Sequence, residues 1–280
     1  MTIATPTVRF SAQFSRWRSR LFGLLGVMLL SSGCGDVPST SQAVISDHGD
    51  LTINYVPSEI EEYQWIQESL EATEFFDDLA NELNTEFAFP EDIEVFFAEC
   101  GEANAFYDPN SVEITMCYEL IEQYMKIFED EIETQEDYDN EVIDAALFTF
   151  FHELGHALVD QYELPITGKE EDAVDDFATV LLIDVYEDEA AFLSGLWQFE
   201  GDAIEEQDHL DDLPFWGEHS LSSQRFYNTA CLIYGSDPDE YEFLIEEDYL
   251  PSDRAERCPE EYEQKSRAWF TLIEPYLQGE

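Results

Sequence analysis

The five residues from His152 to His156 are His-Glu-Leu-Gly-His, a string whose side chains could act together on one metal ion. On a helix, positions i and i+4 lie on the same face, so the two histidines could each offer an imidazole nitrogen. Glu153 stands beside them as a carboxylate that could take a proton from water. Two neutral ligands next to a base are typical of zinc hydrolases. The segment therefore predicts a Zn²⁺ site with Glu153 as general base.

The segment that carries this motif, residues 140–162, has no proline and is apolar nearly all round. A helix that is apolar on most of its surface is a buried helix. Buried histidines and a buried glutamate need partners, and a metal ion would satisfy all three. A core helix with two hydrogen-bonded histidines is the plainer alternative. Gly155 costs about 1 kcal/mol relative to alanine inside a helix, which predicts that another backbone or a substrate approaches closely there.

A third ligand is predicted in the next helix, residues 169–186, which begins after Pro165 and Gly168 interrupt the chain. Its first turn is acidic, as the helix dipole favours. Glu171 and Asp175 are four residues apart and share a face. One could bind the metal while the other accepts the free N–H of a ligand histidine. The choice of ligand stays open among five carboxylates: Glu170, Glu171, Asp172, Asp175 and Asp176.

Together these two segments resemble the gluzincin branch of the zincin metallopeptidases, in which a second helix carries Glu-x-x-x-Asp. The resemblance implies a zincin-like fold, zinc as the metal and a peptide or protein as the substrate. It also implies roles for five residues: His152, His156 and Glu171 as zinc ligands, Glu153 as base, and Asp175 as partner of a ligand histidine.

The chain resembles more closely a bacterial family of inferred zinc metallopeptidases with no assigned substrate, over roughly residues 50–275. The segments that carry this resemblance are 104–120 and 218–231.

An oxyanion needs a hydrogen-bond donor besides the metal, and His219 is the candidate, with Tyr227 and Arg225 behind it. A structural or surface histidine is the alternative for His219.

Residues 50–280 are predicted to form one α+β domain with strands early and helices late. A small N-terminal sheet would contain a hairpin built from Ile93–Glu99 and Val112–Met116. A single helix from about Glu59 to Asn84 precedes it in this prediction. The buried metal-site helix follows, and then a mostly helical part with only short helices between 187 and 224.

In zincins, the edge strand before the metal helix pairs with an extended substrate. A peptide that adds to a sheet edge is a general mode of recognition. Either Asn104–Tyr107 or Val112–Met116 could be that edge here. An ordinary hairpin with no contact to substrate is the alternative.

The N-terminal residues 1–33 are predicted to be a signal peptide, with four arginines and no acid before an apolar run at 21–30. That run is too short to span a bilayer. Cys34 follows small residues, as in a bacterial lipobox, and this resemblance implies a lipid anchor on Cys34 in the cell envelope. A monomer is expected, because an anchor and acidic loops are compatible with a self-contained chain. Residues 34–49 would be a flexible tether. Ordinary cleavage and secretion is the alternative.

The other four cysteines, Cys100, Cys117, Cys231 and Cys258, form an even number that suits an oxidising compartment. Cys100 and Cys117 flank the predicted hairpin strands and are expected to pair. Cys231 and Cys258 would then close a loop in the C-terminal part. Three pairings are possible for four cysteines, and this one is preferred.

The chain has 65 acidic and only 11 basic residues, a net charge of −54. DNA and RNA binding is excluded, because phosphate recognition needs clustered Lys and Arg. A hydrophobic content of 44% and an aromatic content of 14% predict a packed core rather than disorder. Like charges repel one another and salt screens the repulsion, which indicates a saline habitat. An acidic surface suited to cationic substrates is the alternative.

Two functions compete with peptide hydrolysis. One is a non-catalytic envelope lipoprotein that contains zinc and acts as a binding module. Glu153 argues against it, because a structural zinc site would not need that carboxylate. The other is a zinc hydrolase of non-peptide amides, such as those of a cell wall.

Overall fold

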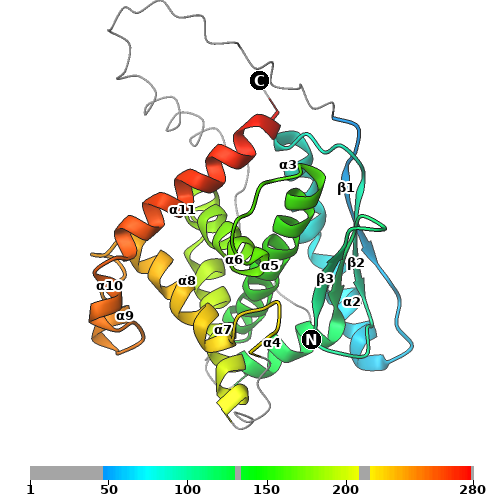
Figure 1. Cartoon of the computed structure of the whole chain (residues 1–280). Helices are drawn as coiled ribbons and strands as arrows, with labels where there is room; N and C mark the ends of the chain where they lie inside the picture. Colours follow the sequence, from blue (N-terminus) through cyan, green and yellow to red (C-terminus); the bar gives the residue numbers. More distant parts are fainter. Residues whose placement is uncertain (1–46, 130–133, 208–214, 279–280) are drawn as a thin grey trace, which may run out of the picture.

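The computed structural model describes residues 47–129, 134–207 and 215–278. The predicted signal peptide, Cys34 and most of the tether lie outside these ranges. At the end of the tether, the backbone N–H groups of His48 and Gly49 both donate to the Phe89 carbonyl at 2.9 Å. Figure 1 shows a small sheet on one side of the molecule and a group of packed helices on the other. The predicted α+β class is confirmed.

The sheet has four strands in the order β1-β2-β4-β3: β1 is Leu51–Tyr55, β2 Ile93–Ala98, β3 Ala105–Asp108 and β4 Glu113–Cys117. Strand β2 pairs in parallel with both β1 and β4, whereas β3 and β4 are antiparallel. The predicted hairpin between Ile93–Glu99 and Val112–Met116 is therefore wrong. After β2 the chain skips one position in the sheet and runs back as β3. Strand β4 then lies between β2 and β3. The hairpin of this sheet is β3–β4.

Strand β3 is an edge of the sheet and β4 is internal. Of the two candidate edges, Val112–Met116 is thus excluded, and Asn104–Tyr107 coincides with the start of β3. Both predicted disulfides are present. Cys100–Cys117 ties the loop after β2 to the end of β4, and Cys231–Cys258 joins two C-terminal helices.

The predicted single helix Glu59–Asn84 is two helices, α2 (Glu61–Thr73) and α3 (Phe75–Glu86). The chain turns at Glu74, whose φ of 54° lies in the left-handed region. The turn lets Phe76 pack against Phe97 of the sheet, with ring centroids 4.8 Å apart, and against Phe150 at 5.7 Å. Core packing therefore overrides the continuous helical pattern.

Helix α5 (Gln135–Gln161) is the centre of the fold and starts five residues earlier than predicted. It packs against α4 (Tyr118–Phe128), against strands β3 and β4, and against the helices that follow it. Among the described residues, α5 is the one helix long and apolar enough to cross a membrane. However, 89% of its most apolar window is buried inside the fold, as in a core helix of a globular protein.

Six helices follow α5 in the described residues, and of these α6 and α7 pack directly on it (Figure 1). They are α6 (Glu170–Leu181), continued by a π-helical turn at Leu182–Tyr186, α7 (Glu189–Gln207), α8 (Ser222–Ser236), α9 (Phe243–Glu246), α10 (Ser252–Ala255) and α11 (Cys258–Ile273), which ends in a 3₁₀ turn at Glu274–Tyr276. The 19-residue α7 contradicts the expectation of only short helices between 187 and 224. It packs tightly on α5, since a Cβ at Gly195 would lie 2.1 Å from the Phe148 ring.

Candidate metal centre

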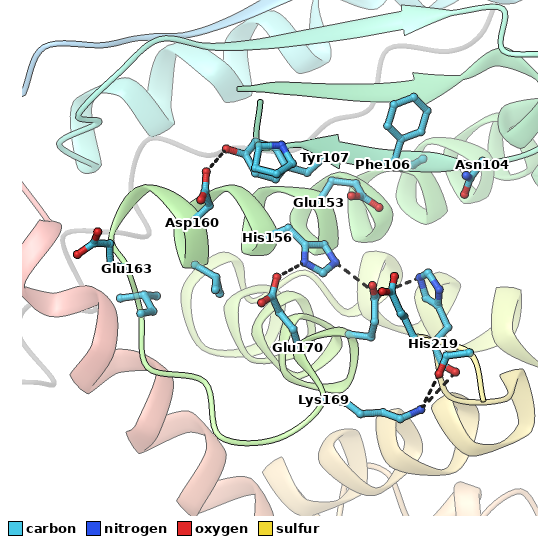
Figure 2. Close-up of a pocket in the computed structure, with 17 residues that line it drawn as sticks. Asn104, Phe106, Tyr107, Glu153, His156, Asp160, Glu163, Lys169, Glu170 and His219 are labelled. Atoms are coloured by element: carbon cyan, nitrogen blue, oxygen red, sulfur yellow. Dashed lines mark hydrogen bonds and ion pairs between the residues drawn. The ribbon is translucent and has the colours of Figure 1, made fainter. Parts of the chain in front are cut away.

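The two motif histidines leave the same face of α5 and point at α6. Oε2 of Glu171, in the first turn of α6, lies 3.2 Å from His152 Nε2 and 3.4 Å from His156 Nε2. His219, which lies just before α8, brings its Nε2 to 2.9 Å from the same oxygen. His156 and His219, both labelled in Figure 2, approach this carboxylate from α5 and from the loop before α8. Three segments far apart in the sequence thus converge on one point.

The Glu171 carboxylate is in an unusual position for a buried group. Its Oε2 is buried and makes no well-aligned hydrogen bond within the described part of the chain, although three ring nitrogens surround it. A buried polar atom needs a partner, and imidazole nitrogen with carboxylate oxygen is a common ligand set for divalent transition metals. One ligand atom each from His152, Glu171 and His219 lie within 4.8 Å of one another. The donors therefore fit a metal ion.

The other ring nitrogen of each motif histidine contacts a carboxylate. His152 Nδ1 lies 2.7 Å from Asp175 Oδ1, and His156 Nδ1 lies 2.8 Å from Glu170 Oε1. A carboxylate that accepts from one ring nitrogen orients the ring and leaves the other nitrogen to face a metal. Asp175 was expected as such a partner, whereas the contact of Glu170 with His156 was not.

Asp175 is itself held by Arg225 of α8. The Arg225 Nε and Nη2 atoms donate to Oδ2 and Oδ1, both at 2.7 Å, and the guanidinium lies 4.1 Å above the Phe199 ring. The sequence suggested that Arg225 stood behind His219, but its partner is the second-helix aspartate. Tyr227, suggested for the same role, is 42% exposed and does not line the site.

Burial and charge act in opposite directions on these groups. Burial opposes ionisation of Asp175, yet Arg225 holds the pKa of this carboxyl well below its usual range. Burial also opposes ionisation of Glu171, while the imidazoles lower its pKa. For His152, burial lowers the pKa, but the carboxylates of Asp175, Glu171 and Glu153 together outweigh burial and raise the pKa to about 9. A bound cation would replace the imidazole protons, because ligand histidines must be neutral.

The remaining acids of the first turns of α6 face other elements. Asp172 accepts a hydrogen bond from Ser220 at 2.6 Å, and Asp176 accepts one from Lys265 at 2.6 Å. Lys169, just before the helix, donates to the carbonyls of Gly217 and His219 at 3.4 Å. Of the five carboxylates left open by the sequence, Glu171 alone lies against the Nε2 atoms of both motif histidines.

Glu153 lies at the floor of a cleft of about 1060 Å³. Strand β3 forms one side of this cleft and the loop at 217–219 lines it as well (Figure 2). Tyr107 of β3 donates to Asp160 of α5 at 2.8 Å and so fixes the edge strand above the metal-site helix. The Glu153 Oε1 atom is 4.0 Å from His152 Nε2, and burial raises the pKa of this carboxyl. A base therefore stands beside the ligand cluster and faces an accessible cleft.

Gly155 allows α5 and α6 to come close enough to build the centre. A Cβ at this position would lie 2.9 Å from the Val174 Cβ and 3.1 Å from the Phe177 ring. The close approach predicted at Gly155 is therefore made by side chains of α6, rather than by another backbone or a substrate.

A family model described as "Putative metallopeptidase" matches residues 55–273. The chain belongs to this family. The matched region of this metallopeptidase family member includes α5, α6 and His219, so the whole centre lies inside it. Neither the comparison with curated proteins nor that with solved structures finds a match. Family membership and the His/Glu/His cluster support a hydrolase that uses a metal ion.

Proposed function

We propose that this protein is a zinc-dependent peptidase in which His152, His156 and Glu171 hold the ion and Glu153 is the general base. The observation that carries the proposal is the position of Glu171 Oε2, buried within 3.4 Å of both motif Nε2 atoms. Two histidines and one glutamate are a known ligand set of catalytic zinc sites. The adjoining cleft gives a substrate access to Glu153.

The residues of the chain divide the chemistry of peptide hydrolysis among them. When bound, zinc would polarise a water molecule and the substrate carbonyl. Glu153 takes a proton from the attacking water and passes it to the leaving amine. His219, whose side chain is 57% exposed, faces the substrate and donates to the developing oxyanion. The free edge of β3 offers backbone groups to an extended peptide.

We further propose that the protein is exported in a bacterium, anchored through a lipid on Cys34, and acts as a monomer on peptides or proteins of the cell envelope. The basic and apolar N-terminal segment supports export. Two disulfides suit an oxidising compartment and support the same location. Labelling of cells with a radioactive fatty acid tests the anchor, because Cys34→Ser should abolish the label.

Zinc content and cleavage of a panel of unfolded proteins test the peptidase. The measurement uses residues 35–280 in high salt, with the Glu153→Gln and His219→Ala variants beside the parent. We expect one zinc ion in each protein, because neither substitution removes a proposed ligand. Glu153→Gln should lower the cleavage rate about 10²–10⁴-fold and His219→Ala about 10²–10³-fold.

Each other outcome has a definite meaning. A parent that binds zinc but cleaves no protein would favour a non-peptide amide hydrolase or a binding module. A parent that binds no zinc would contradict the metal centre itself. Loss of zinc in His219→Ala would make this histidine a ligand instead of a donor to the oxyanion.

A further inference from the structure

A second, smaller cavity of about 160 Å³ lies next to the proposed reaction centre. It shares Asn104, Ala105, Glu153 and His219 with the large cleft, so the two cavities meet at the general base. Its other walls come from helices α4, α5, α7 and α8. A substrate bound across Glu153 would have one side chain beside this cavity.

One buried side chain in the wall has an unused hydrogen-bonding group. Gln198 of α7 is 3% exposed, and its Nε2 has no partner among the residues that the structure describes. Its Oε1 accepts from the Thr149 hydroxyl at 3.3 Å, and Thr149 lies 2.6 Å from the Tyr124 hydroxyl. A buried donor without a partner is destabilising, so a group that accepts from it gains a hydrogen bond. The Gln198 amide therefore offers a hydrogen-bond donor in the cavity wall to a bound acceptor.

The rest of the wall limits which ligand can supply it. Asp202 lines the cavity as a carboxylate and accepts from Gln123 Nε2 at 2.6 Å. A carboxylate ligand would meet repulsion from Asp202 and Glu153. An ammonium or guanidinium group carries donors only, so it could not accept from Gln198 Nε2. An aliphatic ligand would leave Gln198 without a partner.

A carboxamide meets all of these conditions. It carries no charge, its oxygen can accept from Gln198, and its NH₂ can donate to a carboxylate such as Asp202. It also satisfies Gln198 in either orientation of the Gln198 terminal amide, because each amide has both a donor and an acceptor.

We propose that this cavity binds the side chain of an Asn or Gln residue of the substrate, adjacent to the bond that is cleaved. This inference rests on the proposed peptidase function and names the side chain that it prefers. Sites built to hydrogen-bond a substrate group reject analogues that lack the group, because their own polar atoms are then left unpaired.

Binding is measured separately from cleavage to test this assignment. The probes are amidated Ala-Ala-Xaa-Ala-Ala-Ala peptides with Gln, Met or Glu at Xaa, and the protein is the zinc-loaded Glu153→Gln variant. Met has nearly the shape of Gln without its amide. We expect the Gln peptide to bind about tenfold more tightly than the other two. Adding Gln198→Leu should abolish this preference.

The control is Ser194→Ala in the same background, a buried residue of α7 that does not line the cavity. It should keep the preference, which separates a local role of Gln198 from general loosening of α7. Equal affinities for the three peptides, no binding of any of them, or a preference that survives Gln198→Leu would each overturn the assignment.

Cleavage of the same peptides by the parent protein tests the proposed function independently. Selective binding of the Gln peptide without cleavage would refute peptide hydrolysis and leave the cavity assignment standing. Cleavage with equal rates for all three peptides would do the opposite.

Discussion

Two aspartates of this protein are buried to nearly the same extent, yet their pKa values are shifted in opposite directions. Asp175 is 6% exposed and lies between Arg225 and His152, so its pKa is well below the usual range despite burial. Asp144 of α5 is 5% exposed and faces Asp188 and Glu141, and burial with these like charges raises its pKa to about 8. Burial alone therefore does not decide the charge of a carboxyl in this chain. For these two aspartates, the charges beside each one make the difference.

The difference shows where the few cations of the chain are used. Of the seven Lys and Arg residues in the ranges that the structure describes, three contact α6 or the loop that carries His219. Arg225 pairs with Asp175, Lys265 pairs with Asp176, and Lys169 binds two carbonyls of the loop. Asp144, by contrast, faces the carboxyl groups of Asp188 and Glu141. Arg225 keeps the pKa of Asp175 low beside the proposed metal ligands, whereas burial outweighs Lys265 and raises the pKa of Asp176 to about 7.

Replacing Asp175 should break this arrangement most strongly. Asp175→Ala leaves the Arg225 guanidinium, whose side chain is 18% exposed, without its carboxylate, which costs about 3 kcal/mol in the free energy of unfolding, the low end for a buried pair. The proposed zinc affinity should also fall about 10–100-fold, because His152 loses the contact that orients its ring. Urea denaturation and competition with a chelator measure the two effects.

The double variant Asp175→Leu with Arg225→Met separates the causes. Replacing both members of a buried ion pair by apolar residues often restores stability. We expect the double variant to recover most of the free energy of unfolding but none of the zinc affinity. A loss below about 1 kcal/mol in Asp175→Ala would show that the pair does not stabilise the fold.

The unpaired aspartate should make stability depend on pH. The folded state holds the Asp144 proton up to a pKa of about 8, whereas the unfolded chain releases it near the ordinary value of 3.8. This contribution to the free energy of unfolding is therefore fully present below pH 4 and is lost as pH rises to about 8. Asp144→Asn removes the titration. It should be more stable than the parent by about 1–3 kcal/mol at pH 8 and nearly equal at pH 4.

Urea denaturation of both proteins in high salt at several pH values provides the measurement. A stability difference that does not change with pH would mean that Asp144 titrates normally. The companion variant Asp184→Asn changes an aspartate that accepts from the Tyr262 and Ser266 hydroxyls at 2.6 and 2.7 Å. It should instead destabilise the protein, because this carboxylate already has partners.

The contrast also separates what the sequence could predict from what it could not. The helical period and the motif spacing were enough to place α5 and α6, and the even count and flanking positions of the cysteines were enough for the disulfides. The parallel pairing of β2 with β4 was not predicted. Two strands joined by a turn are consistent with a hairpin, and the pattern does not indicate that the chain between them forms a further strand, β3, at the sheet edge. The length of α7 was hidden because it buries the polar residues Ser194 and Gln198 in its interior face.

Partners distant in the chain were the hardest part of the site to predict. Arg225 is 50 residues from Asp175, and no local pattern connects them. The charge count offered a signal that was not used: in a chain with so few cations, an arginine inside an aromatic segment is expected to be buried beside an acid. The same reasoning applies to Lys265 and Asp176.

Asp175 and Glu170, the carboxylates that contact the two motif histidines, should contribute unequally to zinc affinity. We expect the smaller effect for the exposed one, Glu170. Glu170, the partner of His156, has a side chain that is 47% exposed, against 8% for Asp175. Water can replace much of what an exposed carboxylate supplies. Glu170→Gln should therefore lower zinc affinity by about tenfold or less and leave stability unchanged, at the low end for a residue that orients a metal ligand.

Asp175→Asn is the matched substitution, since it also keeps the shape and removes the charge. Chelator competition on the two amide variants gives the ratio of their losses. We expect the loss for Asp175→Asn to be the larger, because its partner charges are buried with it. Equal losses of zinc affinity would mean that the hydrogen bond to the histidine ring supports the centre and that the Arg225–Asp175 pair adds nothing to it. A larger loss for Glu170→Gln would place the main support of the centre on its exposed side.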